Sequence, residues 1–189
     1  MDTYLEVSQT ARKHRRFVLL QVAIAFGALT LRAETAYFAR TNGNWDVAAN
    51  WSTLQIPTPT GVVYIGSSAS GKTNLAVASI IAGDNLSCTN LVLGHNSAAG
   101  CGTLNMSGGF LAVSNGGISC GDSGTGIVMQ TGGTVINAGA LSIGKSSGST
   151  GSWTVAGGTV TNAANVILGN SGVGTMVGDR LGSGLKLDR

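Results

Sequence analysis

A repeated pattern between Cys88 and Gly178 constrains the fold of this chain more than any other feature. Each copy contains a short segment that ends in glycine, a second segment that ends in a double glycine, and a third alternating segment. The double glycines begin at positions 108, 132 and 157, so the copies lie 24 and 25 residues apart. A constant period of this length is typical of repeat proteins in which each copy stacks on the next.

Within each copy, apolar and polar residues alternate, which predicts half-buried strands rather than helices. Three short strands in every copy predict an all-β fold, a parallel β-solenoid of about four coils with about 24–25 residues in each coil. An antiparallel β-sandwich also has short, evenly spaced strands, but it has no need for near-identical copies. We therefore prefer the solenoid.

The alternation also predicts which side chains lie inside, because equivalent positions of neighbouring coils stack about 4.8 Å apart. The first segments supply two inward columns, Leu91, Ile118, Leu141 and Val166, and Leu93, Cys120, Ile143 and Leu168. The second segments supply Leu104, Val128 and Trp153, and Met106, Gln130 and Val155. The third segments supply Leu111, Val135 and Val160, and Val113, Asn137 and Asn162. We expect Asn137 and Asn162 to hydrogen-bond to each other, and the paired glycines to adopt positive φ at tight corners.

The charge of the chain is unevenly distributed. The formal net charge is +3, but the excess lies in the first 33 residues, and from Glu34 onward six basic residues balance six acidic ones. Only 10% of all residues are charged, which together with many β-branched and hydroxyl residues favours an exported all-β protein. A neutral repeat region has no basic face, so we expect no nucleic-acid partner.

Residues 1–33 have the layout of a secretory signal peptide. A basic run, Arg12–Arg16, precedes 15 mostly apolar residues, 17–31, and Ala33 is a suitable small residue for cleavage, with Ala36 as an alternative. The apolar run is shorter than the ~20 residues of a spanning helix. We expect cleavage, no stable membrane span afterwards, and an extracellular or cell-surface location. An uncleaved anchor and a buried core helix are the alternatives.

The segment 34–87 is expected to form an N-terminal cap and the first strands. It contains Asn44-Trp45 and Ala49-Asn50-Trp51-Ser52, whose two tryptophans lie six residues apart, in a polar, turn-rich setting. Large rings over the open end of the core would provide the cap that a solenoid needs. The alternative is that Trp45 and Trp51 contact a glycan.

These features together resemble a known group. The chain is similar to exported bacterial repeat proteins with autotransporter-associated β-strand or PEP-CTERM-type repeats. The similarity lies in the Trp45 and Trp51 motif, in strand ends such as Leu91–Gly94, and in the repeats Gly102–Gly109 and Gln130–Val135. The resemblance covers about Trp45 to Val177. It implies a right-handed parallel β-helix, export, and a role at the cell surface or in the matrix. The end of the chain departs from the group, because it has no Pro-Glu-Pro motif and no apolar sorting helix.

One stretch matches the phosphate-binding loop pattern. Gly66–Thr73 reads G-x-x-x-x-G-K-T after an apolar run, so Lys72 would reach a phosphate and Thr73 would hold Mg²⁺. The surrounding sequence offers no alternating helices and strands to support such a site. The simpler interpretation is a turn between two strands, with 75–81 as either a strand or a helix. Nucleotide binding is therefore a remote alternative.

The period also predicts a group of polar and charged residues at equivalent positions of successive copies. The residues after the strand-closing glycines are His95, Asp122, Lys145 and Asn170, which would form a column on one corner. Such a column is either an acid/base or metal site or an exposed charge ladder worth little stability. Carboxylates are scarce, since between Thr41 and Gly178 the acids are Asp46, Asp84 and Asp122. We therefore expect no catalytic residue, no metal and no cofactor.

The three cysteines do not have the spacing of a metal site. Cys120 falls in an inward column and is expected to be buried, whereas Cys88 and Cys101 would be able to form a disulfide in an oxidising compartment. After Gly178 the pattern is lost, and 179–189 is interpreted as a divergent or truncated tail.

The sequence thus predicts a non-catalytic exported or cell-surface β-solenoid with a structural or adhesive role. Its partners would be an extracellular polysaccharide or components of the cell envelope, and its copies would be able to associate end to end. A carbohydrate-binding or polysaccharide-degrading β-helix is the alternative.

Overall fold

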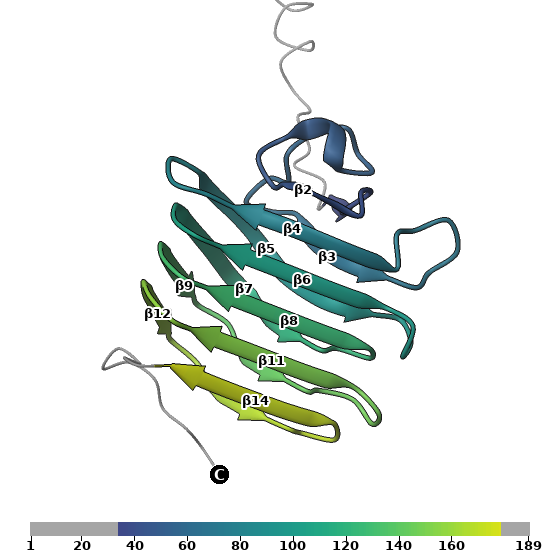
Figure 1. Ribbon diagram of the computed structural model, residues 1–189, viewed down its shortest axis with the longest axis vertical. Helices are drawn as coiled ribbons and strands as arrows, with labels where there is room; N and C mark the ends of the chain where they lie inside the picture. Colours follow the sequence, from purple (N-terminus) through teal and green to yellow (C-terminus); the bar gives the residue numbers. More distant parts are fainter. Residues whose placement is uncertain (1–33, 179–189) are drawn as a thin grey trace, which may run out of the picture. The chain divides into compact units, whose positions relative to one another are not determined.

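Strands that lie one coil apart in the sequence pair in parallel throughout residues 34–178, the part of the chain that the computed structural model describes (Figure 1). The strands are β1 (Thr35–Tyr37), β2 (Asn42–Asn44), β3 (Val62–Ser67), β4 (Leu75–Ile80), β5 (Asn85–His95), β6 (Cys101–Met106), β7 (Phe110–Cys120), β8 (Thr125–Gln130), β9 (Thr134–Asn137), β10 (Leu141–Ile143), β11 (Thr150–Val155), β12 (Thr159–Asn162), β13 (Val166–Leu168) and β14 (Val173–Gly178). A single turn of 3₁₀ helix, Ala48–Asn50, follows β2. The predicted signal peptide, 1–33, and tail, 179–189, lie outside the described residues.

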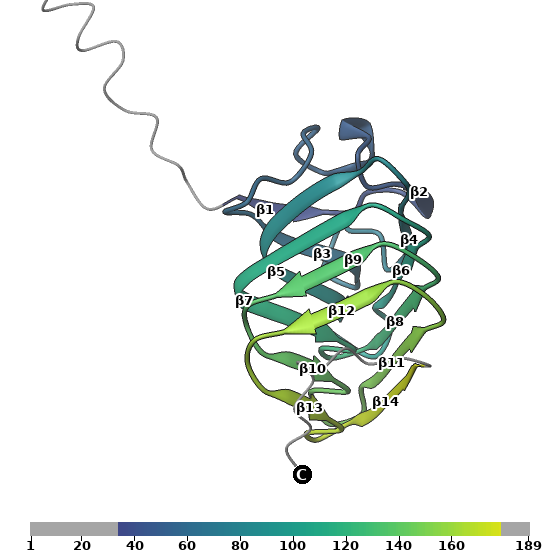
Figure 2. The same ribbon diagram turned by 90° about the vertical axis from the view of Figure 1, so that its left-hand side faces the viewer.

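The strands form three walls around one core. The first wall contains β1, β3, the C-terminal parts of β5 and β7, β10 and β13, and the second contains β2, β4, β6, β8, β11 and β14. The third wall contains the N-terminal parts of β5 and β7 with β9 and β12. Figure 2 shows how the long strands β5 and β7 run from the third wall into the first.

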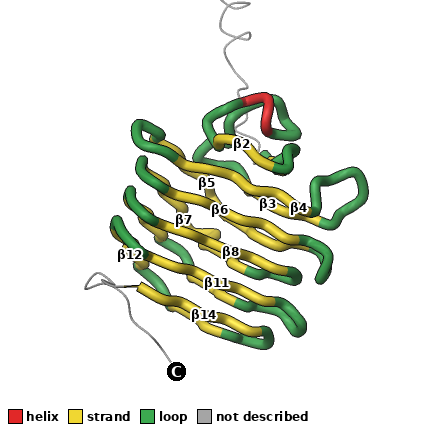
Figure 3. Tube along the Cα trace, in the orientation of Figure 1, coloured by secondary structure: helices red, strands yellow, loops and turns green. Residues whose placement is uncertain are grey.

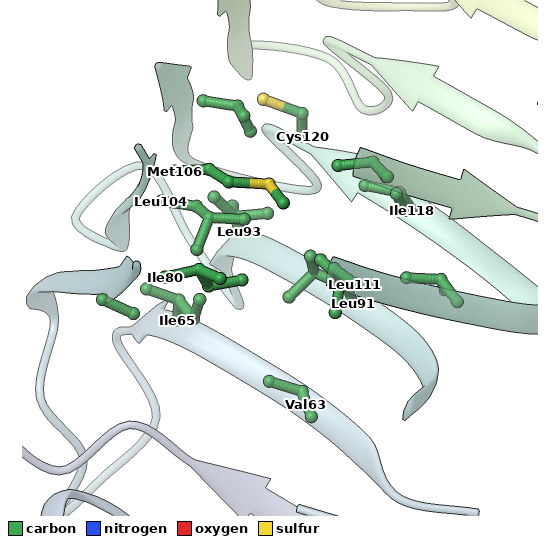
Figure 4. Packing of buried hydrophobic residues seen from close by; sticks show 14 of the residues in the cluster. Val63, Ile65, Ile80, Leu91, Leu93, Leu104, Met106, Leu111, Ile118 and Cys120 are labelled. Atoms are coloured by element: carbon green, nitrogen blue, oxygen red, sulfur yellow. The ribbon is translucent and has the colours of Figure 1, made fainter. Parts of the chain in front are cut away.

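The inward columns predicted from the alternation are confirmed except at Leu168, which keeps its register with Ile143 but is 40% exposed. In the first wall Leu91 pairs with Ile118, Ile118 with Leu141, and Leu141 with Val166. The columns of the second and third walls follow the same parallel register. The buried apolar side chains from all three walls form one cluster, part of which Figure 4 shows. The alternation therefore dictates the core, because every inward position stacks on its equivalent in the next coil.

The solenoid is longer than predicted. The second wall has six strands, which mark about six coils where about four were expected. The additional coils come from 34–87, where β1 pairs with β3 and β2 pairs with β4. These coils lack the double glycines of the later copies, so the period does not reveal them. The long connection between β2 and β3 forms the cap (Figure 3).

Each coil turns sharply at the glycine that ends its first-wall strand. The φ values at these glycines lie between 64° and 75° (Gly66, Gly94, Gly121, Gly144 and Gly169). A Cβ at Gly121 would lie 2.3 Å from the backbone oxygen of Thr150 in the next coil. Only glycine permits both this backbone conformation and this close approach. Of the paired glycines, which were all predicted to have positive φ, only the second of each pair does (Gly109, Gly133 and Gly158), whereas Gly108, Gly132 and Gly157 do not.

Candidate functional site

The residues that follow the corner glycines lie in one column on the edge of the first wall. Ser67 of β3 pairs with His95 of β5, and the column continues through Asp122 and Lys145 in the next two coils. Because each of these residues comes directly after a corner glycine, they occupy equivalent positions in successive coils, and their side chains lie next to one another along the edge of the wall. The three ionisable side chains therefore meet in the folded chain, although they are 27 and 23 residues apart.

Asp122 lies at the centre of this column. His95 Nδ1 donates a hydrogen bond to Asp122 Oδ2 at 3.2 Å, and Lys145 Nζ donates to Oδ1 at 2.7 Å. Ser123 Oγ donates to Oδ2 at 3.0 Å. The side chain of Asp122 is 13% exposed, whereas that of Lys145 is 48% exposed. Asp122 thus links three consecutive coils through both of its oxygens.

The ionisation of Asp122 follows from these contacts. Burial by itself would raise the pKa of Asp122, but hydrogen bonds from Lys145 and His95, the charge of Lys145 and the hydroxyl of Ser123 outweigh it. The pKa therefore lies below its ordinary value, and the carboxylate is ionised at neutral pH. Because its oxygens already accept these bonds, Asp122 is engaged as a link between coils.

Asn170 takes a lesser part in the column. Its side-chain amide donates to the backbone oxygen of Lys145 at 3.4 Å, so it contacts the chain rather than the charged groups. Among residues 34–178 no three His, Cys, Asp or Glu side chains gather as a metal ion would require. The column therefore offers a charge network and no metal-ligand set in the described residues.

Two tyrosines extend the column toward the N-terminal cap. The Tyr64 and His95 rings are 4.4 Å apart between centroids, and Tyr37 stacks on Tyr64 at 4.9 Å with an interplanar angle of 16°. The Lys72 ammonium lies 4.5 Å from the centroid of the Tyr37 ring. We call Lys72, Tyr37, Tyr64, His95, Asp122 and Lys145 the first-wall stripe. Burial raises the pKa of Tyr64, and Tyr37 and Asp122 raise it further while Lys145 lowers it.

The aromatic part of this stripe was not predicted from the sequence. Gly66 was interpreted as part of a turn between two strands, with a phosphate-binding loop as the remote alternative, but its role as the corner glycine one coil before Gly94 was not predicted. Aligning these two glycines would have placed Tyr64 on the outer surface, in register with Val92. Tyr37 would then have followed from its position one coil earlier, opposite Tyr64.

The phosphate-loop motif has a different structure from the one its pattern predicts. Gly66–Thr73 connects β3 to β4 and does not lead into a helix. The loop is closed by a hydrogen bond from the Ser67 amide to the Thr73 oxygen at 3.0 Å, and Lys72 contacts Tyr37. Since the loop–helix arrangement is what presents amides to a phosphate, this geometry supports the turn interpretation.

Trp45 and Trp51 belong to the cap. Both side chains are 0% exposed, and their ring centroids lie 5.0 Å apart. Trp51 Nε1 donates to the backbone oxygen of Trp45 at 2.7 Å, and Phe38 packs edge-on against Trp51. Neither indole presents a face on which a sugar could stack. The glycan contact considered for these residues therefore has no surface in this structure, because both rings are used to close the N-terminal end of the core.

The cysteines are all free. Cys120 lies inside, as predicted, and Cys88 is also buried, and burial raises the pKa of each thiol to about 12. The disulfide considered between Cys88 and Cys101 is not formed. Two of the three thiols are thus small core side chains with little thiolate at neutral pH.

Comparisons with known proteins identify no relative of this chain. The chain matches no protein-family model, no curated protein and no solved structure. In the described residues, no helix is long and apolar enough to cross a membrane. The function must therefore be argued from the solenoid and the first-wall stripe themselves.

Proposed function

We propose that this chain is an exported or cell-surface β-solenoid with a structural or adhesive role and no catalysis. The observation that supports this role best is the position of Asp122, whose carboxylate joins the coils of His95, Asp122 and Lys145. The polar groups of the corner are thus used to hold coils together. A second link of this kind lies in the core, where the Asn137 side chain bonds to that of Asn162.

The proposed location rests on the sequence of residues 1–33, with its basic run and its apolar stretch 17–31. The resemblance to exported bacterial repeat proteins favours the same location. In this setting the partner would be an extracellular polysaccharide or a component of the cell envelope. At the N-terminal end the cap of Trp45 and Trp51 covers the core, so end-to-end association there would require the cap to move.

Export is tested with the full chain carrying a C-terminal tag in a bacterial host. The protein should be recovered outside the cytoplasm, with a new N-terminus after Ala33 or Ala36 that mass spectrometry identifies. Leu20→Arg, which interrupts the apolar stretch, should retain the chain in the cytoplasm, whereas Leu20→Val should be exported. Cytoplasmic wild-type protein with an intact N-terminus would contradict the proposal.

The adhesive role needs a separate measurement. The exported protein should be retained on immobilised cell-envelope polysaccharide, and retention should not change when Asp122 is replaced by Asn in protein that remains folded. If the wild type degrades the polysaccharide, and Asp122→Asn binds it normally but does not degrade it, then the column of His95, Asp122 and Lys145 is catalytic and the proposed role is incorrect.

A further inference from the structure

The outer face of the second wall is a flat surface without charge. Five consecutive strands, β4, β6, β8, β11 and β14, lie side by side in it, and Figure 1 shows this wall from outside. Their alternate side chains point outward in three columns. The columns contain Leu75, Cys101, Thr125, Thr150 and Val173; Val77, Thr103, Ile127, Ser152 and Thr175; and Ser79, Asn105, Met129, Thr154 and Val177. We call these 15 residues the second-wall face.

The composition of the second-wall face differs from that of the first-wall stripe. Six of its side chains are apolar, seven carry a hydroxyl group, and none is charged. Leu75 is 59% exposed, Met129 52%, Val173 63% and Val177 58%. Exposed apolar side chains in a charge-free patch are typical of interaction surfaces, whose central residues are depleted in charge.

The size of the face agrees with a weak protein interface. Five strands at a spacing of about 4.8 Å and six residues at about 3.3 Å give a surface of about 24 by 20 Å. Pairing two such faces would bury about 1,000 Å² in total, which is the lower limit for a specific interface. The association should therefore depend strongly on protein concentration.

The chemistry of the face fits a copy of itself. Two identical uncharged faces do not repel each other, and hydroxyl groups both donate and accept hydrogen bonds, so each can pair with its own kind. β8 is the central strand of the five, and Ile127 is central within it, so a two-fold axis through the face would place Ile127 against Ile127. A neutral glycan is a weaker candidate, because these strands carry no aromatic ring on their outward side.

We propose that the second-wall face binds the same face of a second copy of this chain, sheet against sheet, about a two-fold axis. The interior strands of the wall are hydrogen-bonded on both sides, so the contact is made by side chains and not by strand addition. This association differs from end-to-end stacking, and it does not depend on the proposed export.

The test measures the mass of the protein in solution, using the chain as it is recovered from the expressing cells with its N-terminus determined. Sedimentation velocity over a wide concentration range should show a weight-average mass that rises toward twice that of one chain. Ile127→Lys should raise the dissociation constant more than about tenfold, since it places like charges opposite each other. Thr161→Lys, on the exposed face of β12, should associate as the wild type does.

A pair of variants with opposite charges shows whether Ile127→Lys loses association through charge repulsion or through misfolding. Ile127→Lys and Ile127→Glu should each remain single chains, but a mixture of the two should associate, because unlike charges then meet at the axis. A wild-type protein that stays a single chain at every concentration would overturn the proposal, and so would failure of the mixture to associate. If the wild type stays single yet binds an insoluble neutral polysaccharide, and Ile127→Lys abolishes that binding, the face belongs to a glycan and the proposed self-association is wrong.

Discussion

Asn137 and Asn162 lie one above the other inside the third wall, and the side-chain amide of Asn137 donates to the side-chain oxygen of Asn162 at 2.5 Å. Asn137 also donates to the backbone oxygen of Gly139 at 2.8 Å. Both side chains are buried, 1% and 4% exposed. Polar groups are tolerated here because the repeat places one amide in reach of the next.

Replacing one member of this pair should be costly. Asn137→Ala leaves the Asn162 side-chain oxygen buried without its donor, so the free energy of unfolding should fall by about 2 kcal/mol. In chemical denaturation the double variant, with Asn162→Ala as well, should lose less than the sum of the single losses. The outward neighbour Thr161→Ala serves as the control and should change little. Additive losses would show that the two amides are not coupled.

A buried charge in the same wall should unfold the middle of the solenoid. Val135 is 1% exposed and stacks between Leu111 and Val160, so Val135→Asp should cost about 4 kcal/mol or more. Ile136 is the next residue and points outward at 42% exposure. Ile136→Asp should therefore keep the wild-type circular dichroism and melting temperature. Equal effects at the two positions would contradict the assigned alternation.

Stability should decrease in acid partly through Asp122. Its pKa is lower in the folded chain than in the unfolded one, so its ion pairs stabilise the fold above the unfolded-state pKa. This contribution is lost as the pH falls through the folded-state pKa. In denaturation experiments from neutral to acidic pH, the difference in stability between the wild type and Asp122→Asn should shrink as the pH falls. A constant difference between the wild type and Asp122→Asn across this pH range would contradict the assignment.

A corner glycine and a glycine in an open turn should differ sharply in their tolerance of alanine. Gly121 and Gly148 have nearly the same φ, 75° and 76°, but a Cβ at Gly148 meets no atom within 4 Å. Gly148→Ala should thus cost only about 1–2 kcal/mol of backbone strain. Gly121→Ala should cost clearly more, because its Cβ would lie 2.3 Å from the Thr150 oxygen. Thermal melts of the two variants make the comparison, and equal melting temperatures would show that the close approach is unimportant.

The cap should be required for stability. Trp51 packs between Phe38 and Trp45 with 0% exposure, so Trp51→Ala should lower the unfolding free energy by about 3–5 kcal/mol. Because Trp153 is also buried, acrylamide should quench the tryptophan fluorescence of the folded wild type only weakly. Strong quenching in the native state would show that the cap opens and exposes its rings.

The repeat made much of the fold predictable from the sequence. From Cys88 onward, the period and the alternation identified the inward columns, including the Asn137 and Asn162 pair and the burial of Cys120, with Leu168 as an exposed exception. They also placed His95, Asp122 and Lys145 on one corner. These inferences succeed because in-register parallel pairing brings equivalent residues of successive copies together, so a column can be read directly from the spacing.

The sequence by itself therefore determined the solenoid, its core columns and the charged corner. Only the tertiary structure decided that β1 to β4 add further coils, that Gly66 is a corner glycine, and that Tyr64 and Tyr37 extend the stripe beyond His95. The N-terminal coils carry no double glycine, and the cap between β2 and β3 interrupts their spacing. The N-terminal strands that pair with each other are separated by unequal numbers of residues along the chain. A fixed period therefore cannot predict their register.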